Sequence, residues 1–144
     1  MITEQEYDEF EQRMLATYPQ LFSQPFGGFA IGQGWWPVIE ALCHNIQSHV
    51  NHRNEQATKY NRGVPMEQPV VAQIKEKFGG LRFYLDGADE QIWGMIRMAE
   101  CWADSSCEEC GAPGKRRSGG WIRTLCDHHE QEHQQRMAQY ATTT

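Results

Sequence analysis

Cysteine and histidine are concentrated near the carboxyl end of the chain. Cys107 and Cys110 are separated by two residues, and Cys126 and His129 repeat this spacing after fifteen intervening residues. Thiolate sulfur and imidazole nitrogen are donors that zinc prefers, and four of them at such a spacing are typical of a tetrahedral structural site. We therefore expect one structural Zn²⁺ ion held by these four residues, with no coordination position left open for catalysis.

Two alternatives remain open at this site. The cysteines could be free or disulfide-bonded, which the spacing disfavours, and His128 could replace His129 as the fourth ligand. Five cysteines, three of them assigned to metal, fit a reducing cytosol better than an oxidising compartment, so we expect a cytoplasmic protein. The remaining two, Cys43 and Cys101, lie in apolar helical contexts and are expected to be buried thiols.

The elements that must position these ligands follow from the surrounding residues. The polar, turn-rich stretch Ala112–Gly120 precedes a short apolar run and predicts a hairpin, and Glu130–Tyr140 predicts a helix whose first turn carries Cys126 and His129. A knuckle, a hairpin and a helix-borne second ligand pair resemble a treble-clef zinc finger. We expect residues 105–141 to form this module, integrated with a body of residues 1–104 in a single domain, 1–144.

Length and charge limit the function classes. A chain of 144 residues is long enough for one domain with a real core, and no apolar run approaches membrane-spanning length. The start of the chain lacks the basic and apolar segments of a signal peptide. The net charge of −6 disfavours general nucleic-acid binding, although local basic patches can still bind phosphate.

Three helices are predicted in the body. Thr3 and Glu6 form a capping box that opens a helix to about Ala16, and Pro37 lies in the first turn of a second helix that reaches Val50. Residues 20–34 and 51–68 are predicted loops, and a third helix runs from a cap near Asp89 to about Asp104. Whether the adjacent Trp35 and Trp36 line a pocket or fill the core stays open.

The clearest strand pattern is Val70–Leu85, which predicts a β-hairpin with Gly79-Gly80 as its two-residue turn. This register pairs Phe78 with Leu81, Ile74 with Leu85, and Lys77 with Arg82. It gives an apolar face (Val70, Ala72, Ile74, Phe78, Leu81, Phe83 and Leu85) and a polar face (Gln73, Lys75, Lys77, Arg82 and Tyr84). Glu76 falls awkwardly on the apolar face. The predicted fold class is α+β: a small antiparallel sheet built on this hairpin, about three helices, and the zinc module.

Several of these strings together resemble a family of small uncharacterised bacteriophage and prophage proteins. They are Gly34-Trp35, the hairpin string from Gln73 to Tyr84, the Cys107–Gly114 knuckle and the Trp121–His129 segment, so the resemblance covers about residues 32–129. It implies a phage-type cytosolic protein with a zinc knuckle and no established activity. The family often has an acidic residue before the Gly-Trp pair, where this chain has Gln33, which weakens any assignment of carboxylate chemistry there.

Enzymatic activity is the weakest expectation, because the chain has no Gly-rich phosphate loop, nucleophile elbow or zinc-protease motif. A metal-dependent nuclease built on His128, His129 and His133 lacks clustered carboxylates. We instead expect a non-enzymatic binding protein that inhibits or modulates a host protein, for which an acidic face with Glu4, Asp8 and Glu11 is a candidate surface.

The alternative is a binder of a nucleotide or nucleic acid. Lys75, Lys77 and Arg82 lie beside Tyr84 on the polar hairpin face, where cations can contact phosphate and the ring can stack on a base. The basic run Lys115, Arg116 and Arg117 would add phosphate contacts. The simpler interpretation of either charged surface is solubility, since lysines commonly protect exposed sheet faces and edges. No membrane partner is expected, and the oligomeric state is left open.

Overall fold

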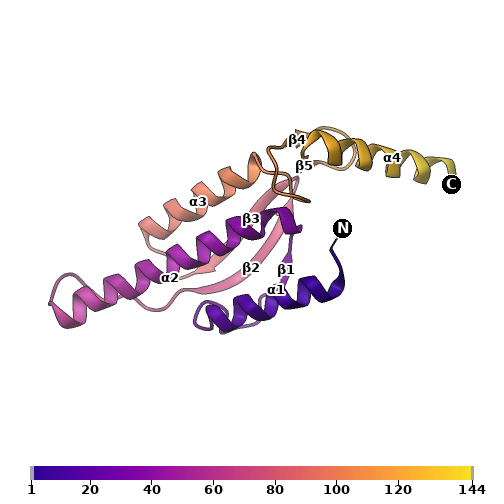
Figure 1. Cartoon of the computed structure of the whole chain (residues 1–144). Coiled ribbons are helices and arrows are strands. Elements are labelled where there is room, and N and C mark those ends of the chain that lie inside the picture. The colour runs from indigo at the N-terminus through magenta and orange to yellow at the C-terminus, as the bar shows by residue number, and fades with distance from the viewer. Residues whose placement is uncertain (1, 144) are drawn as a thin grey trace.

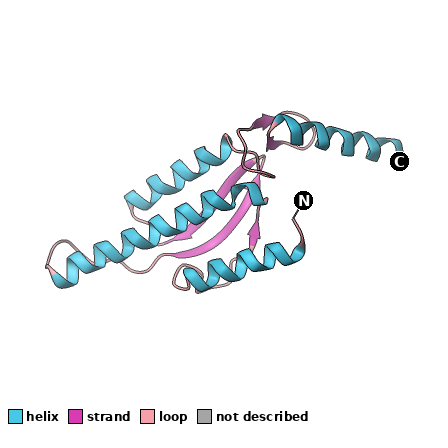
Figure 2. Ribbon diagram, in the orientation of Figure 1, coloured by secondary structure: helices cyan, strands magenta, loops and turns pink. Residues whose placement is uncertain are grey.

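The computed structural model describes residues 2–143 as an α+β fold. Helices α2 and α3 lie side by side against the three-stranded sheet, while α4 extends outward beyond the second, two-stranded sheet (Figures 1 and 2). Among these residues, no helix is both long enough and apolar enough to cross a bilayer. The elements in chain order are α1 (Glu4–Thr17), β1 (Phe29–Ala30), the 3-10 helix η1 (Gln33–Trp35), α2 (Trp36–Lys59), β2 (Val70–Lys77), β3 (Gly80–Asp86), α3 (Glu90–Asp104), β4 (Lys115–Arg117), β5 (Arg123–Leu125) and α4 (Asp127–Thr143).

The predicted helix starts agree with the structure. The Glu6 amide donates to Thr3 Oγ1 at 3.1 Å and the Thr3 amide donates to Glu6 Oε2 at 2.8 Å, which completes the capping box of α1. Asp89 caps α3 by accepting a hydrogen bond from the Ile92 amide at 2.9 Å. Each cap satisfies backbone N–H groups that have no partner inside the helix.

The predicted loop after Val50 is wrong in its first half, because α2 continues to Lys59. Neither glycine nor proline interrupts residues 51–59, and their polar side chains hold the following loop against the helix. Arg53 Nε donates to the Val64 carbonyl oxygen at 2.9 Å, and Asn54 Oδ1 accepts from the Met66 amide at 2.8 Å. A helix extension of this kind shows no apolar stripe, so the hydrophobic pattern did not reveal it.

The main sheet is mixed rather than antiparallel, with strand order β1-β2-β3. The short strand β1 pairs parallel with β2 and places Phe29 beside Ile74, in a segment that was predicted to be loop. Phe29 is buried, and its amide donates to the Tyr7 hydroxyl at 2.7 Å. Two residues are too few to show strand alternation in a sequence, which is why this pairing was missed.

The hairpin turn lies one residue earlier than predicted. Phe78 and Gly79 occupy it with φ of 52° and 79°, while Gly80 pairs with Lys77 inside the ladder. Two positive φ values are the requirement of a type I′ turn, whose twist matches that of the flanking strands. The Gly79 amide donates to Glu76 Oε2 at 2.8 Å, which gives the awkwardly placed carboxylate a partner at the turn.

The shifted turn and a bulge between Val71 and Gln73 also revise the apolar face. Val71 is buried where Val70 and Ala72 were expected, and Phe78 is 67% exposed. The polar face keeps its predicted members, because Gln73 pairs with Tyr84 and Lys75 pairs with Arg82. Moving the turn by one residue changes each cross-strand pair by two positions, so these residues stay on the same face, and the bulge lies beyond them.

Trp35 fills the core and is fully buried, and its indole Nε1 donates to the Ser106 carbonyl oxygen at 2.9 Å. Trp36 is partly buried and stacks on Phe10, with 4.2 Å between ring centroids. Cys43 is buried as predicted, and burial raises the pKa of its thiol. Cys101 is exposed on α3, contrary to prediction, because it lies opposite the stripe that packs on the sheet.

Candidate metal centre

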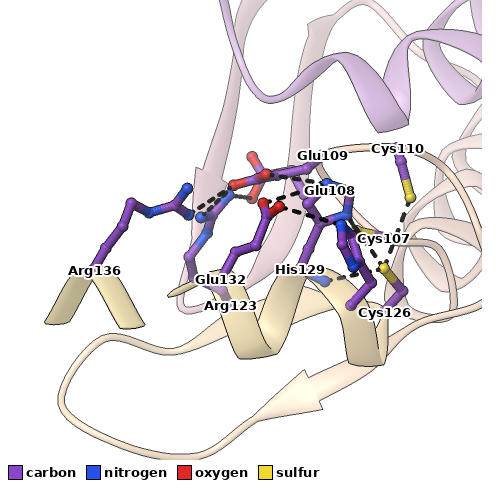
Figure 3. Close-up of polar contacts among 10 residues, drawn as sticks. Cys107, Glu108, Glu109, Cys110, Arg123, Cys126, His129, Glu132 and Arg136 are labelled. Carbon is purple, nitrogen blue, oxygen red and sulfur yellow. Dashed lines mark hydrogen bonds and ion pairs between the residues drawn. The ribbon is translucent and has the colours of Figure 1, made fainter. Parts of the chain in front are cut away.

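The four predicted ligands converge between the knuckle and the first turn of α4 (Figure 3). Their ligand atoms all lie within 4.8 Å of one another. The Sγ atoms of Cys110 and Cys126 are 3.8 Å apart, and all five cysteines of the chain are free. Because a disulfide requires a sulfur–sulfur distance of about 2.05 Å, the structure excludes the disulfide alternative.

The spacing of the donor atoms fits a single tetrahedral metal ion. Metal–sulfur bonds of about 2.3 Å and a metal–nitrogen bond of about 2.0 Å separate two sulfurs by roughly 3.8 Å and a sulfur from the nitrogen by roughly 3.5 Å. Cys110 and Cys126 match the first value at 3.8 Å. His129 Nδ1 lies 3.2 Å from Cys126 Sγ and 3.6 Å from Cys107 Sγ, which brackets the second.

His129, rather than His128, belongs to this cluster. The His129 ring is held by its position in the first turn of α4, where its amide also donates to Cys126 Sγ at 3.4 Å. The His128 side chain is 72% exposed and pairs instead with Glu132, at 3.2 Å between Nε2 and Oε1. His128, His129 and Glu132 also lie close enough to share an ion, but that set uses the same His129.

Local backbone geometry shapes the knuckle. The Gly111 amide donates to the Cys107 carbonyl oxygen at 2.8 Å, and the Cys107 amide donates to the Ala112 carbonyl oxygen at 2.7 Å. Gly111 has a φ of 81°, a conformation that glycine adopts without strain. β4 and β5 then pair antiparallel, with Lys115 beside Leu125, which confirms the predicted hairpin between the two ligand pairs.

The close approach of the donor atoms shifts the pKa values of the Cys110 and Cys126 thiols. For Cys110, an amide hydrogen bond from Ala112 lowers the pKa, but loss of hydration and hydrogen bonds with Cys107 and Cys126 raise it to about 11. For Cys126, loss of hydration raises the pKa, but the amide and imidazole of His129 outweigh it and lower the pKa to about 7. A metal ion bound here would displace the protons of the Cys110 and Cys126 thiols.

A charged layer that the sequence did not reveal lies behind His129. His129 Nε2 is 3.6 Å from Glu109 Oε2, and Glu109 Oε1 accepts from Arg123 at 3.0 Å and Arg136 at 3.3 Å (Figure 3). Burial raises the pKa of Glu109, but Arg123 outweighs it and the pKa is lowered. An ionised carboxylate beside Nε2 orients a histidine that binds metal through Nδ1.

The knuckle is attached to the body through backbone contacts. The Gly34 amide donates to the Glu108 carbonyl oxygen at 2.7 Å, and the Gly32 amide donates to Glu108 Oε2 at 2.9 Å. On the other side, Thr124 Oγ1 donates to the Gly79 carbonyl oxygen at 2.6 Å. The segments that carry the candidate metal ligands therefore contact both the residues that precede α2 and the turn of the main hairpin.

The basic residues predicted to bind phosphate separate into two groups. On the β4–β5 hairpin, Arg116 pairs with Asp104 at 2.6 Å and Arg117 pairs with Asp127 at 2.8 Å, which leaves only Lys115 of that run without an ion pair in the described residues. Lys75, Lys77, Arg82 and Tyr84 instead share the outer face of the sheet. Arg116 nevertheless lies close to the turn end of this face, because a Cβ atom built on Gly80 would be 2.9 Å from Arg116 Nη2.

The basic residues on the outer face of the sheet are not paired with a carboxylate in the described part of the chain. Within residues 2–143, Lys75, Lys77 and Arg82 form no ion pair with a carboxylate. Lys77 Nζ lies 5.8 Å from the centroid of the Phe78 ring. Tyr84 is 43% exposed on the same face.

No protein-family model, curated protein or solved structure matches the chain.

Proposed function

We propose that the metal is zinc and that residues 105–141 form a treble-clef-like module around it. Three thiols and one imidazole are a donor set typical of structural zinc, and they supply four protein ligands. The knuckle, the β4–β5 hairpin and the first turn of α4 follow in treble-clef order. A saturated site of this kind stabilises the fold and leaves no position for a reacting water.

We propose further that the protein is a non-enzymatic binding protein that holds single-stranded nucleic acid on the outer face of the main sheet. One observation carries this proposal: Lys75 lies directly opposite Arg82 in the ladder, and neither has a carboxylate partner in residues 2–143. Like charges directly opposite one another destabilise a sheet. A phosphate group between them would turn this repulsion into attraction.

The aromatic residues on this face suit a single strand. Tyr84 and Phe78 are exposed at opposite ends of the basic cluster, and bases of any sequence can stack on such rings. The net charge of −6 opposes binding elsewhere on the molecule, so the partner is expected to contact this face alone. Two of the other cations, Arg116 and Arg13, are paired with Asp104 and Glu40.

A second candidate is a phage-type modulator of a host protein. Glu4 and Asp8 are exposed on α1 and Glu11 is partly exposed, and within residues 2–143 none of the three forms an ion pair. This acidic face would compete for a basic surface on the host partner. A solvated helix face has the same composition, so the basic sheet face has the stronger physical support.

The test compares Lys75→Glu with Arg62→Glu, which makes the same charge change outside the face, after α2. Binding of a labelled mixed-sequence DNA or RNA single strand is followed by fluorescence anisotropy over a range of salt concentrations. Lys75→Glu should weaken binding by at least about tenfold, because an attraction becomes a repulsion. The same change should leave the melting temperature equal or higher, since the new carboxylate opposite Arg82 forms a favourable cross-strand pair worth roughly 0.2–1 kcal/mol.

Binding by the wild-type protein should also weaken steeply with salt, because each neutralised phosphate releases counterions. Equal losses of nucleic-acid affinity in Lys75→Glu and Arg62→Glu would show that only net charge matters and would refute the assignment of this face. Binding of mononucleotides alone would restrict the partner to a nucleotide. A protein partner that survives nuclease treatment, tolerates Lys75→Glu and is lost in Glu4→Lys/Asp8→Lys would favour the second candidate.

A further inference from the structure

Helix α3 carries two apolar seams, and only one of them packs inside the molecule. The buried seam consists of Ile92, Ile96, Ala99 and Ala103. The second seam is exposed and consists of Gly94, Met98, Cys101 and Trp102. Its members recur at i, i+4, i+7 and i+8, which is the spacing of a helix face that packs on another helix.

The exposed seam combines large side chains with open space over Gly94. Met98 is 74% exposed and Trp102 is 46% exposed. A Cβ atom at Gly94 would have no atom within 4 Å, so no close approach inside the molecule requires glycine there. Glycine inside a helix is destabilising by roughly 0.5–1 kcal/mol relative to alanine. The open space over Gly94 is therefore unexplained by packing within one chain.

We propose that this seam is the contact surface of a homodimer, in which α3 packs antiparallel against α3 of a second copy with Met98 at the two-fold axis. Residues equally far from Met98 on either side then face one another. Trp102 of each copy lies over Gly94 of the other, so the indole fills the open space twice. An isologous interface requires this self-complementarity, in which one patch supplies both the knob and the hollow.

Charges at the ends of the seam agree with this arrangement. The antiparallel order places Asp104 opposite Ile92 and Glu90 opposite Ser106 of the second copy, so Asp104 and Glu90 are offset by about 3 Å along the helices. Asp104 is bonded to Arg116 at 2.6 Å, and Glu90 forms no ion pair within residues 2–143. Arg116 can therefore bridge the two carboxylates at each end. Opposed helix dipoles add a favourable term, because each α3 amino end meets a carboxyl end.

The area of the seam predicts a weak dimer. One half-exposed tryptophan, one largely exposed methionine and their neighbours offer on the order of 300–400 Å² per copy. This is below the roughly 800 Å² per partner of a standard stable interface. We expect a dimer that forms at about 10–500 μM and dissociates on dilution. The inference concerns a different face from the proposed nucleic-acid surface and does not depend on it.

Sedimentation velocity of the zinc-loaded protein over this concentration range tests the proposal. The wild-type protein should shift from monomer to dimer. Met98→Glu should remain monomeric throughout with an unchanged melting temperature, because it places two carboxylates at the axis on an exposed position. Met137→Glu on α4 is the matched control and should dimerise like the wild type. A wild-type monomer at all concentrations, or equal behaviour of the two variants, would overturn the proposal.

Cross-linking tests the orientation. Met98→Cys should form a disulfide-linked dimer under mild oxidation with zinc bound, since the two residues meet at the axis. Trp93→Cys, which lies outside the seam on the same helix, should not. Cys101 of the wild type should not cross-link to itself, because the antiparallel order separates the two copies of Cys101 by roughly 9 Å along the helices. A Cys101–Cys101 disulfide in the wild-type protein would refute the antiparallel arrangement.

Discussion

Substituting Gly34 by alanine should be among the most damaging single-methyl changes in the protein. A Cβ atom built on Gly34 would lie 2.1 Å from the Cys107 carbonyl oxygen and 2.6 Å from the Gly111 amide nitrogen. Both atoms belong to the backbone of the metal knuckle, so no side chain can rotate away. The φ of Gly34 does not lie in the left-handed region, and the expected effect is therefore steric alone.

The size of the destabilisation follows from the backbone shift that the added methyl group requires. Relieving the overlap requires a shift of roughly 1 Å between η1 and the knuckle, and overpacking of this kind costs about 1–3 kcal/mol. The shift also stretches the hydrogen bond from Gly34 to Glu108 and that from Trp35 to Ser106, at about 1 kcal/mol each. The total is roughly 3–5 kcal/mol, which corresponds to a melting temperature lower by about 6–20 °C for a domain of this size.

Urea denaturation of the zinc-loaded protein, together with zinc competition against a chromophoric chelator, measures both consequences. Gly34→Ala should lose stability and release zinc more readily, since distorting the knuckle moves Cys107 and Cys110. Gly94→Ala is the matched control, because a Cβ there meets nothing within 4 Å; at concentrations where the protein is monomeric it should be neutral or stabilising by up to about 1 kcal/mol. A stability for Gly34→Ala within about 0.5 kcal/mol of the wild type would show that the knuckle does not dock on η1.

Two further predictions concern the metal and the turn. Chelation, or Cys110→Ser, should lower the melting temperature sharply. Zinc affinity should fall as the pH decreases below about 11, where protons compete for Cys110, and more steeply below about 7, where they also compete for Cys126. Competition titrations at several pH values check this, and a pH-independent affinity would contradict thiolate ligation. Phe78 and Gly79 both have positive φ, which asparagine tolerates and a β-branched residue does not. Phe78→Asn should therefore stabilise the protein by roughly 0.5–1 kcal/mol, and Gly79→Val should destabilise it by about 1–3 kcal/mol. Thermal melts check both, and a destabilised Phe78→Asn would place the turn elsewhere.

Local signals explain what the sequence predicted correctly. The clustering of the four candidate ligands depends on spacing along a few residues, and the caps at Thr3 and Asp89 depend on contacts within one helical turn. The hairpin was found for the same reason, but its turn was misplaced by one residue. Gly79-Gly80 is the stronger turn dipeptide, yet the turn is Phe78-Gly79, where the Gly79 amide bonds to Glu76 and its carbonyl oxygen accepts from Thr124. Contacts in the tertiary structure overrode local turn preference.

Non-local contacts explain what was missed. The pairing of β1 with β2 depends on a register of two residues, and the neutralisation of Arg116 and Arg117 depends on acids from α3 and α4. The contact that requires Gly34 joins it to residues more than seventy positions away. A single sequence carries no local signal of contacts between distant residues, because the residues next to each of them in the chain do not reveal the partner.

The contacts around Gly79 link the metal module to the proposed binding face. Thr124 donates to the Gly79 carbonyl oxygen, and a Cβ at Gly79 would touch Ile122 and Arg123 at 3.2–3.3 Å. The turn that ends both basic strands therefore rests on β5, which immediately precedes Cys126. Thr124→Val removes this hydrogen bond at similar volume and leaves a buried carbonyl without its partner, which should cost about 1–3 kcal/mol. If the metal module only stabilises the body, Thr124→Val should lower the melting temperature and leave nucleic-acid affinity unchanged at temperatures where the protein stays folded. Loss of affinity in the folded variant would instead show that β5 sets the geometry of the basic face.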